Sequence, residues 1–128
     1  MLTNRELDLM AVLWDSGPST AGEVQAALRE EGEDLAYTTV LTILRVLEEK
    51  GYARHRADGR AHRFRAAVTR RAAARSTIRR LVRRMFHGSR EMFLAHLVSD
   101  GRVRRETLQR MRKMLKRRIN GGEIRLQP

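Results

Sequence analysis

The chain has 128 residues, 27 Lys and Arg against 15 Asp and Glu, and a formal net charge of +12. That length suits one domain or two small ones, and the absence of Cys excludes disulfides, thiolate metal sites and a Cys nucleophile. No apolar run reaches the roughly 18 residues of a membrane span, and the N-terminal segment lacks the pattern of a signal peptide, so we expect a cytoplasmic protein.

The charges are distributed unevenly along the chain. Residues 1–51 contain four cations and ten acids, whereas residues 52–128 contain 23 cations and five acids. Such a basic excess favours a polyanion as partner. Of the cations, 24 are Arg, whose planar guanidinium suits phosphate oxygens and base edges. A GC-rich genome, which encodes Arg in place of Lys, is an alternative explanation for this ratio, but it explains the clustering poorly.

Two helices are predicted at the start of the chain. The first begins after Thr3, whose spacing to Glu6 is that of a capping box, and it ends at a Ser-Gly-Pro stop. The second begins after Thr20, with Glu23 completing another capping box. The apolar stripe of the first helix is predicted to be Leu7, Met10, Ala11 and Trp14.

A third helix is predicted over residues 37–50, with Gly51 as its left-handed cap. Its polar side presents Thr38, Thr39, Thr42 and Arg45. Its buried stripe is predicted to be Val40, Ile43, Leu44 and Leu47.

A basic β-hairpin is predicted after the third helix. Two alternating segments, 52–57 and 60–66, flank the turn signal Asp58-Gly59. Phe64 has the parity to pack on the helices. Arg54 and Arg56 share one side of the first strand. Arg63 and Arg65 share one side of the second strand, opposite to the side of Phe64. Three helices followed by such a hairpin is the order of a winged helix-turn-helix, in which the third helix enters the major groove.

The remainder of the chain is predicted to be helical, over about 69–86, 89–99 and 104–120. Within the middle helix, Met92, Phe93, Leu97 and Val98 are expected to face inward. The apolar stripes of these short helices are too broad to be buried by packing against one another alone. A second copy of the chain is therefore expected to cover them. The predicted dimer interface comprises Ile78, Leu81, Met85, Phe93, Leu97, Leu108, Met111 and Leu115.

The chain is therefore expected to be mainly α-helical with a small β-hairpin. Residues 1–67 are assigned to a winged helix-turn-helix domain, 68–121 to a helical dimerisation domain and 122–128 to a flexible tail. The predicted DNA-binding residues are Thr38, Thr39, Thr42, Arg45, Arg54, Arg56, Arg60, Arg63 and Arg65.

Several of these assignments have alternatives. Arg45 can contact a guanine or pair with Glu48 or Glu49 on its own helix, and the wing arginines can be a solvated surface. Most of the arginines in 70–84 are interpreted as a solvated face, with the first two closest to DNA.

Catalytic and metal-binding patterns are weak, and we expect neither an enzyme nor a cofactor. His55 and His62 are placed across the hairpin, but no third metal ligand accompanies them. A winged-helix protein that binds RNA or the ribosome, and a protein–protein adaptor that uses the acidic first helices, remain alternative functions.

Three segments resemble the BlaI/MecI penicillinase-repressor family. They are LTNRELDLMAVLW, LAYTTVLTILRVLEEKGYARH and GRAHRFR, which lie within residues 2–67. The resemblance implies a homodimeric transcriptional repressor whose subunits each read half of a palindromic operator in double-stranded DNA. It also implies a sensor-linked protease as a partner, since well-known members are cleaved at an Asn-Phe bond in the dimerisation arm. The corresponding pair here is His96-Leu97, and the Cys pairs of copper-responsive relatives are absent.

Overall fold

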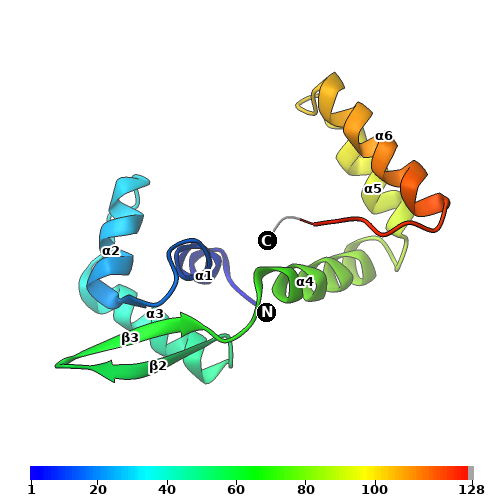
Figure 1. Ribbon diagram of the computed structural model, residues 1–128. Helices are drawn as coiled ribbons and strands as arrows, with labels where there is room; N and C mark the ends of the chain where they lie inside the picture. Colours follow the sequence, from blue (N-terminus) through cyan, green and yellow to red (C-terminus); the bar gives the residue numbers. More distant parts are fainter. Residues whose placement is uncertain (127–128) are drawn as a thin grey trace. The chain divides into compact units, whose positions relative to one another are not determined.

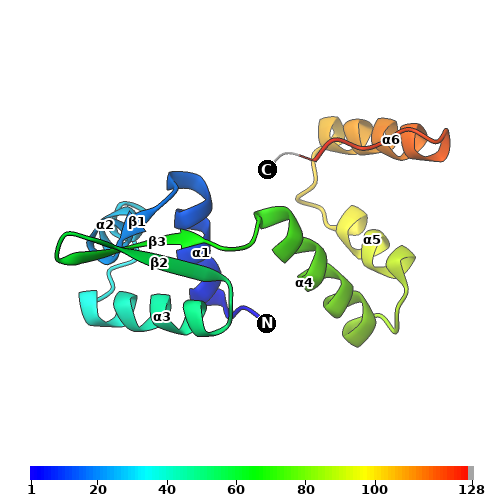
Figure 2. The same cartoon turned by 60° about the horizontal axis from the view of Figure 1, so that its bottom comes forward.

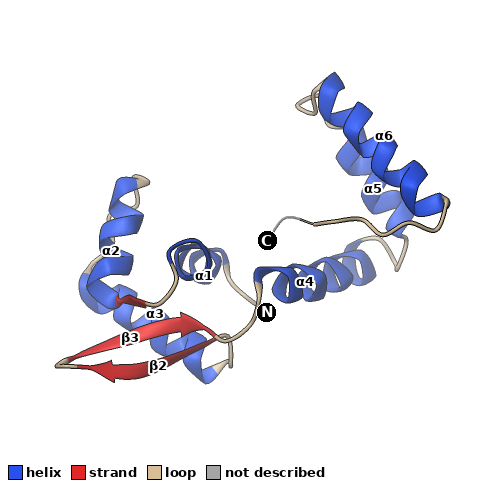
Figure 3. Cartoon of the chain, viewed as in Figure 1, coloured by secondary structure: helices blue, strands red, loops and turns tan. Residues whose placement is uncertain are grey.

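The computed structural model describes residues 1–126, which divide into two compact units (Figure 1). The first unit is Met1–Ala74 and the second begins at Arg75. The secondary structure of both is coloured in Figure 3. The predicted tail contains no helix or strand over 122–126, and its residues 127 and 128 lie outside the described part of the chain.

The first unit combines three helices with a small antiparallel sheet. Its helices are α1 (Asn4–Ser16), α2 (Ala21–Glu30) and α3 (Tyr37–Glu49), and its strands are β1 (Ser19–Thr20), β2 (Ala53–Asp58) and β3 (Ala61–Ala66). The strand order is β1-β3-β2, so the hairpin predicted from the sequence gains a third strand. Strand β1 was not predicted because two residues are too few for an alternating pattern.

The hydrophobic core of the first unit lies between the three helices and β3. Phe64 is 1% exposed, and it is the largest of the fully buried side chains. The prediction that Phe64 packs on the helices is therefore confirmed. From α3 the core receives Val40, Leu44 and Leu47, while the predicted Ile43 lies at its margin.

The apolar stripe predicted to be buried on α1 is wrong, because a neighbouring side of the helix faces the core. Leu9 and Leu13 face the core with Met10, whereas Leu7 is exposed and Trp14 is only partly buried. Because α1 has apolar residues on two sides, its spacing alone did not identify the buried one. Trp14 instead reaches the segment after β3, where its indole N–H donates to the carbonyl of Val68 at 2.9 Å.

Both predicted capping boxes are confirmed. In α1 the Thr3 hydroxyl accepts from the Glu6 N–H, and a Glu6 carboxylate oxygen accepts from the Thr3 N–H at 2.7 Å. The Glu6 carboxylate also pairs with the Lys50 ammonium at 2.9 Å. Burial alone would raise the pKa of Glu6, but the Thr3 and Lys50 contacts outweigh it and hold that pKa below its ordinary value.

The lowered pKa of Glu6 makes the stability of the first unit depend on pH. A carboxyl group with a depressed pKa stabilises the fold above its ordinary value of 4.5, and this contribution is lost as the pH falls through the folded pKa. We therefore expect Glu6→Gln to unfold at lower urea concentration than the native chain at about pH 7 and to match it more closely near pH 3. Urea titrations at both pH values measure this, and an equal difference at the two pH values would contradict it.

The tip of the hairpin is a two-residue turn placed one position later than predicted. Asp58 pairs with Ala61, which leaves Gly59 and Arg60 as the turn residues. Gly59 has φ of 62°, in the region that glycine adopts most easily, and Arg60 has no positive φ. This sign pattern is that of a type II′ turn, with glycine at the first central position.

The second unit is helical. It contains most of α4 (Arg70–Met85), together with α5 (Arg90–Ser99) and α6 (Arg105–Ile119). The expectation that α5 directs its apolar side chains inward is wrong for the single chain, since Met92, Leu97 and Val98 are all exposed and α5 contains no buried residue. The apolar residues of α5 are spread around the helix, so no single side of it gathers them for burial within one chain.

No helix within residues 1–126 has the length and hydropathy that crossing a membrane requires.

Candidate nucleic-acid interface

One side of α3 is buried and the other is polar and exposed. Thr38, Thr39, Thr42 and Arg45 all lie on the exposed side. The Thr42 hydroxyl donates to the Thr38 carbonyl at 2.8 Å, so its oxygen remains free to accept a hydrogen bond. The N-cap residue of α3, Ala36, provides no side-chain cap, unlike Thr3 and Thr20 at the starts of α1 and α2. The first N–H groups of α3 are therefore available to an anion.

Arg45 has no internal ionic partner within residues 1–126. The predicted alternative, pairing with Glu48 or Glu49, is not seen within residues 1–126. The Glu48 carboxylate instead accepts from the backbone N–H of His55 at 2.9 Å and contacts its ring Nδ1 at 2.7 Å. Glu48 thus ties α3 to β2, and Arg45 remains free to contact a ligand.

The arginines of the hairpin gather on one face of the sheet. Arg54 lies opposite Arg65 and Arg56 opposite Arg63, so these four share a face, and Arg60 lies in the turn. We call residues 53–66 the wing. Helix α3 runs alongside β2 (Figures 1 and 2), which places the wing next to the third helix. The exposed arginines of the wing that form no ion pair in the described chain are Arg54, Arg56, Arg60 and Arg65.

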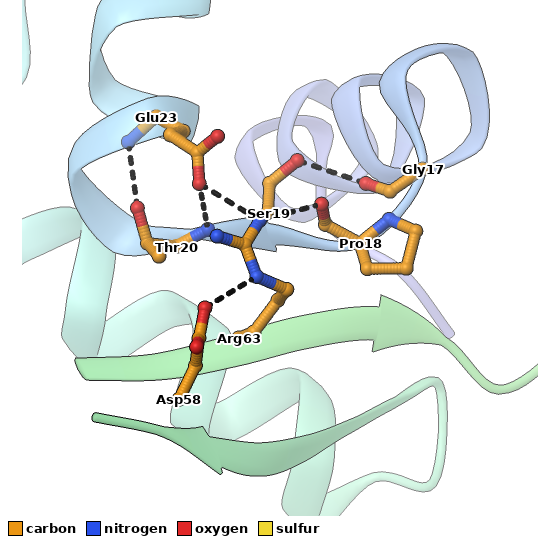
Figure 4. Close-up of polar contacts among 7 residues, drawn as sticks. All are labelled: Gly17, Pro18, Ser19, Thr20, Glu23, Asp58 and Arg63. Atoms are coloured by element: carbon orange, nitrogen blue, oxygen red, sulfur yellow. Dashed lines mark hydrogen bonds and ion pairs between the residues drawn. The ribbon is translucent and has the colours of Figure 1, made fainter. Parts of the chain in front are cut away.

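Arg63 differs from the other wing arginines because its guanidinium is held inside the first unit (Figure 4). Its Nε donates to Asp58 at 2.9 Å, and its Nη1 donates to Glu23 at 3.0 Å and to the Pro18 carbonyl at 3.1 Å. The hydrogen bond to Asp58, reinforced by the Glu23 charge, raises the pKa of Arg63. Arg63 therefore fastens the wing to the start of α2.

Glu23 has two structural tasks at the start of α2. Its carboxylate accepts from the Thr20 N–H at 3.1 Å, which is the largest cause of its lowered pKa, and it also receives the Arg63 guanidinium. The sequence showed the capping box but not the contact with Arg63, which joins residues 40 positions apart. The short strand β1 is what places them together, because Thr20 lies opposite Arg63 in the sheet.

Removing the Arg63 guanidinium is expected to loosen the wing. In Arg63→Ala, Asp58 and Glu23 lose their shared cation, and we expect faster amide hydrogen exchange along β2 and β3. The matched control is Arg65→Ala, since Arg65 lies on the same strand and face but has no ion pair among the described residues. Exchange measured by NMR should rise in the first variant only, and equal exchange in both would show that the Arg63 contacts do not hold the wing.

The two wing histidines stack on one another. His55 lies opposite Phe64 and His62 opposite Ala57, so they are diagonal neighbours and not directly paired. Their rings are 4.4 Å apart between centroids and inclined by 17°. Over residues 1–126, no group of three His, Asp or Glu side chains is arranged to hold a metal ion.

The predicted interface residues of the second unit lie on its apolar surface. Ile78, Leu81, Met85, Leu97 and Leu115 are exposed, whereas Phe93, Leu108 and Met111 are partly buried. An open apolar groove of about 610 Å³ runs between α5 and α6. The apolar residues that line it are Leu94, Val98, Leu108, Met111, Leu115 and Ile119.

The architecture is similar to that of several solved structures. RosR from Halobacterium salinarum is 16% identical, with a TM-score of 0.53 over 94% of this chain and 96% of that one. A MarR family protein from Bacillus stearothermophilus is 17% identical, with a TM-score of 0.53 over 94% and 74%. A ferric uptake regulator from Vibrio cholerae is 20% identical, with a TM-score of 0.49, and this chain covers only 56% of its length. The first two likenesses establish the winged-helix fold with further C-terminal helices.

The sequence match identifies the family. No curated protein matches the chain. The family described as penicillinase repressor matches residues 2–117, which includes both units and extends well beyond the segments that carried the resemblance. This is a family of transcriptional repressors and not of enzymes. With its winged-helix fold, its exposed third helix and its basic wing, the chain belongs to the penicillinase repressor family.

Proposed function

We propose that the chain is a homodimeric, DNA-binding transcriptional repressor that reads a palindromic operator with α3 and the wing. The observation that carries the proposal is the exposed polar side of α3 beside four wing arginines that have no internal ionic partner in the described chain. An arginine without a carboxylate to neutralise it favours an anionic ligand. Because the chain belongs to a family of transcriptional repressors, DNA is the expected ligand.

The side chains have different tasks in this proposal. Arg45 makes a bidentate contact with a guanine in the major groove, while the threonines contact base edges and thymine methyl groups. Phosphate binds at the uncapped start of α3, where Ala36 leaves the N–H groups free. The wing arginines neutralise backbone phosphates, which adds affinity without adding sequence preference.

Dimerisation is proposed through the apolar surface of the second unit. The exposed side chains of α4 and α5 include Ile78, Met85 and Leu97, and the groove between α5 and α6 is lined almost entirely by apolar groups. A surface of this kind is usually covered by a partner, and two-fold pairing of identical surfaces is the commonest arrangement. Sedimentation equilibrium is expected to give about twice the 14.8 kDa mass of the chain.

The proposed function is tested by titrating the chain with duplex from its own promoter region and with a random duplex. Fluorescence anisotropy should show tighter binding to the promoter duplex, and structured RNA should compete poorly. Equal affinity for both duplexes would contradict operator reading. Displacement by structured RNA would favour an RNA-binding function.

The part of the wing in this function is tested separately by Arg54→Ala/Arg56→Ala. Each lost phosphate contact lowers the salt slope of log K by about 0.9, so two contacts in each subunit of a dimer lower it by roughly 3 to 4. The control is Arg5→Gln/Arg29→Gln, which removes two cations that form exposed ion pairs with Glu33 and Asp34. The control should leave the slope unchanged, and an unchanged slope in the wing variant would remove the wing from the interface.

A further inference from the structure

The net charge of the chain belongs entirely to the second unit. Residues 1–74 contain eleven cations and eleven acids, whereas residues 75–128 contain 16 cations and four acids. The first unit, which contains α3 and the wing, is therefore neutral as a whole. The excess of +12 lies in the helical unit that the proposed function uses only for dimerisation.

The cations of the second unit have no ionic partners inside the described chain. The eight ion pairs found within residues 1–126 all lie in the first unit. Every Lys and Arg in 75–126 is exposed except Arg80, which is partly buried. The few acids of this unit therefore do not neutralise its cations.

Helix α4 shows how these cations are arranged. Arg75, Arg79 and Arg83 follow one another at intervals of four residues, which places them along one side of the helix. Its apolar residues Ile78 and Met85 lie on another side. We call the side formed by Arg75, Arg79, Arg80, Arg83 and Arg84 the arginine face of α4.

The arginine face lowers the stability of α4 as an isolated helix. Like charges four residues apart repel, and α4 contains no Asp or Glu to offset them. The helix dipole favours cations only in the last turn, and therefore accounts for Arg83 and Arg84 but not for Arg75 or Arg79. A solvated helix surface normally mixes charges of both signs, which this one does not. A bound polyanion would remove the repulsion.

We propose that the second unit holds a sequence-independent binding surface for the phosphate backbone of duplex DNA, centred on the arginine face of α4. Of its 16 cations, 14 are Arg, whose guanidinium fork matches phosphate oxygens. The unit contains no Trp or Tyr, the residues that are enriched where proteins meet the membrane–water interface. The first unit thus contributes sequence reading, and the second contributes affinity that does not depend on sequence.

The test is the salt dependence with which the full chain binds a random duplex. Arg75→Gln/Arg79→Gln removes two charges from the arginine face while keeping residues that favour helix. The same control variant, Arg5→Gln/Arg29→Gln, lowers the net charge by the same amount in the first unit. We expect the slope of log K against log salt to fall by about 1.8 per chain in the arginine-face variant only, so that its loss of affinity is about tenfold greater at 50 than at 200 mM salt.

A second readout separates binding from folding. Because the substitutions relieve repulsion between neighbouring cations, the arginine-face variant should unfold at the same temperature as the native chain or higher. An unchanged salt slope, or an equal fall in the control, would overturn the inference. Loss of binding to phosphatidylglycerol vesicles with duplex binding intact would overturn it in favour of a membrane surface. Equal native affinity for promoter and random duplexes would contradict the proposed function but not this inference, which is judged on the slope alone.

Discussion

Replacing Phe64 with alanine is expected to destabilise the first unit by about 3–5 kcal/mol, as for other fully buried aromatic residues. Phe64 is 1% exposed and lies on β3, the central strand of the sheet, where it joins the strands to the buried sides of α1, α2 and α3. Its removal leaves a cavity that the surrounding helices cannot fill without moving.

Trp14 makes the effect of Phe64→Ala measurable. It is the only Trp of the chain, and it lies in the first unit, so its fluorescence during urea titration reports the unfolding of that unit. The control is Phe93→Ala, which changes a partly buried ring in the second unit. A loss below about 1 kcal/mol for Phe64→Ala would mean that Phe64 does not hold the core together.

Replacing Arg45 with alanine is expected to weaken binding to the operator by about 1–3 kcal/mol for each half-site, the usual value of a bidentate guanine contact. The structure leaves this guanidinium exposed and without an ionic partner in residues 1–126, and Glu48 is paired with His55 instead. No comparable loss is expected with a random duplex, since phosphate contacts dominate there.

A conservative variant distinguishes base reading from simple attraction. Arg45→Lys keeps the charge but loses the planar fork that binds a guanine at two atoms. Promoter affinity should therefore fall in Arg45→Lys almost as far as in Arg45→Ala, while random-duplex affinity stays at the native value. Full rescue of promoter affinity by lysine would show that Arg45 contacts a phosphate and not a base.

Local patterns predicted the helix starts and the hairpin well. Thr3 with Glu6, and Thr20 with Glu23, form the capping boxes that their spacing indicates, since such boxes depend only on residues three apart. Phe64 was correctly placed in the core because a strand has a fixed alternation of two faces. The family resemblance, based on residues 2–67, is confirmed by a match over 2–117.

Features that depend on distant residues were missed. The buried side of α1 was assigned to the wrong stripe, because only the neighbouring helices decide whether Leu7 or Leu9 is covered. The partners of Arg63 could not be foreseen either. They come from β1, α2 and the end of β2, and β1 is too short to be recognised before the sheet is known.

The two structural units divide the charge of the chain differently from a division at residue 51. Dividing the sequence at residue 51 made the wing and the following helices basic together. The structural division at residue 74 shows that the acids of α1, α2 and α3 balance the wing, and that the surplus lies in the second unit. In the proposed function the wing arginines therefore act by position, through their exposure beside α3, rather than by giving the first unit a net positive charge.

Hydroxyl-radical footprinting of the promoter region of this chain tests whether two copies read one palindromic site. We predict two protected segments related by a dyad, with centres about one helical turn, ~34 Å, apart, as expected when two third helices enter successive major grooves on one side of the duplex. Protection without dyad symmetry, or protection spread evenly along the duplex, would show that two copies do not read one palindromic site.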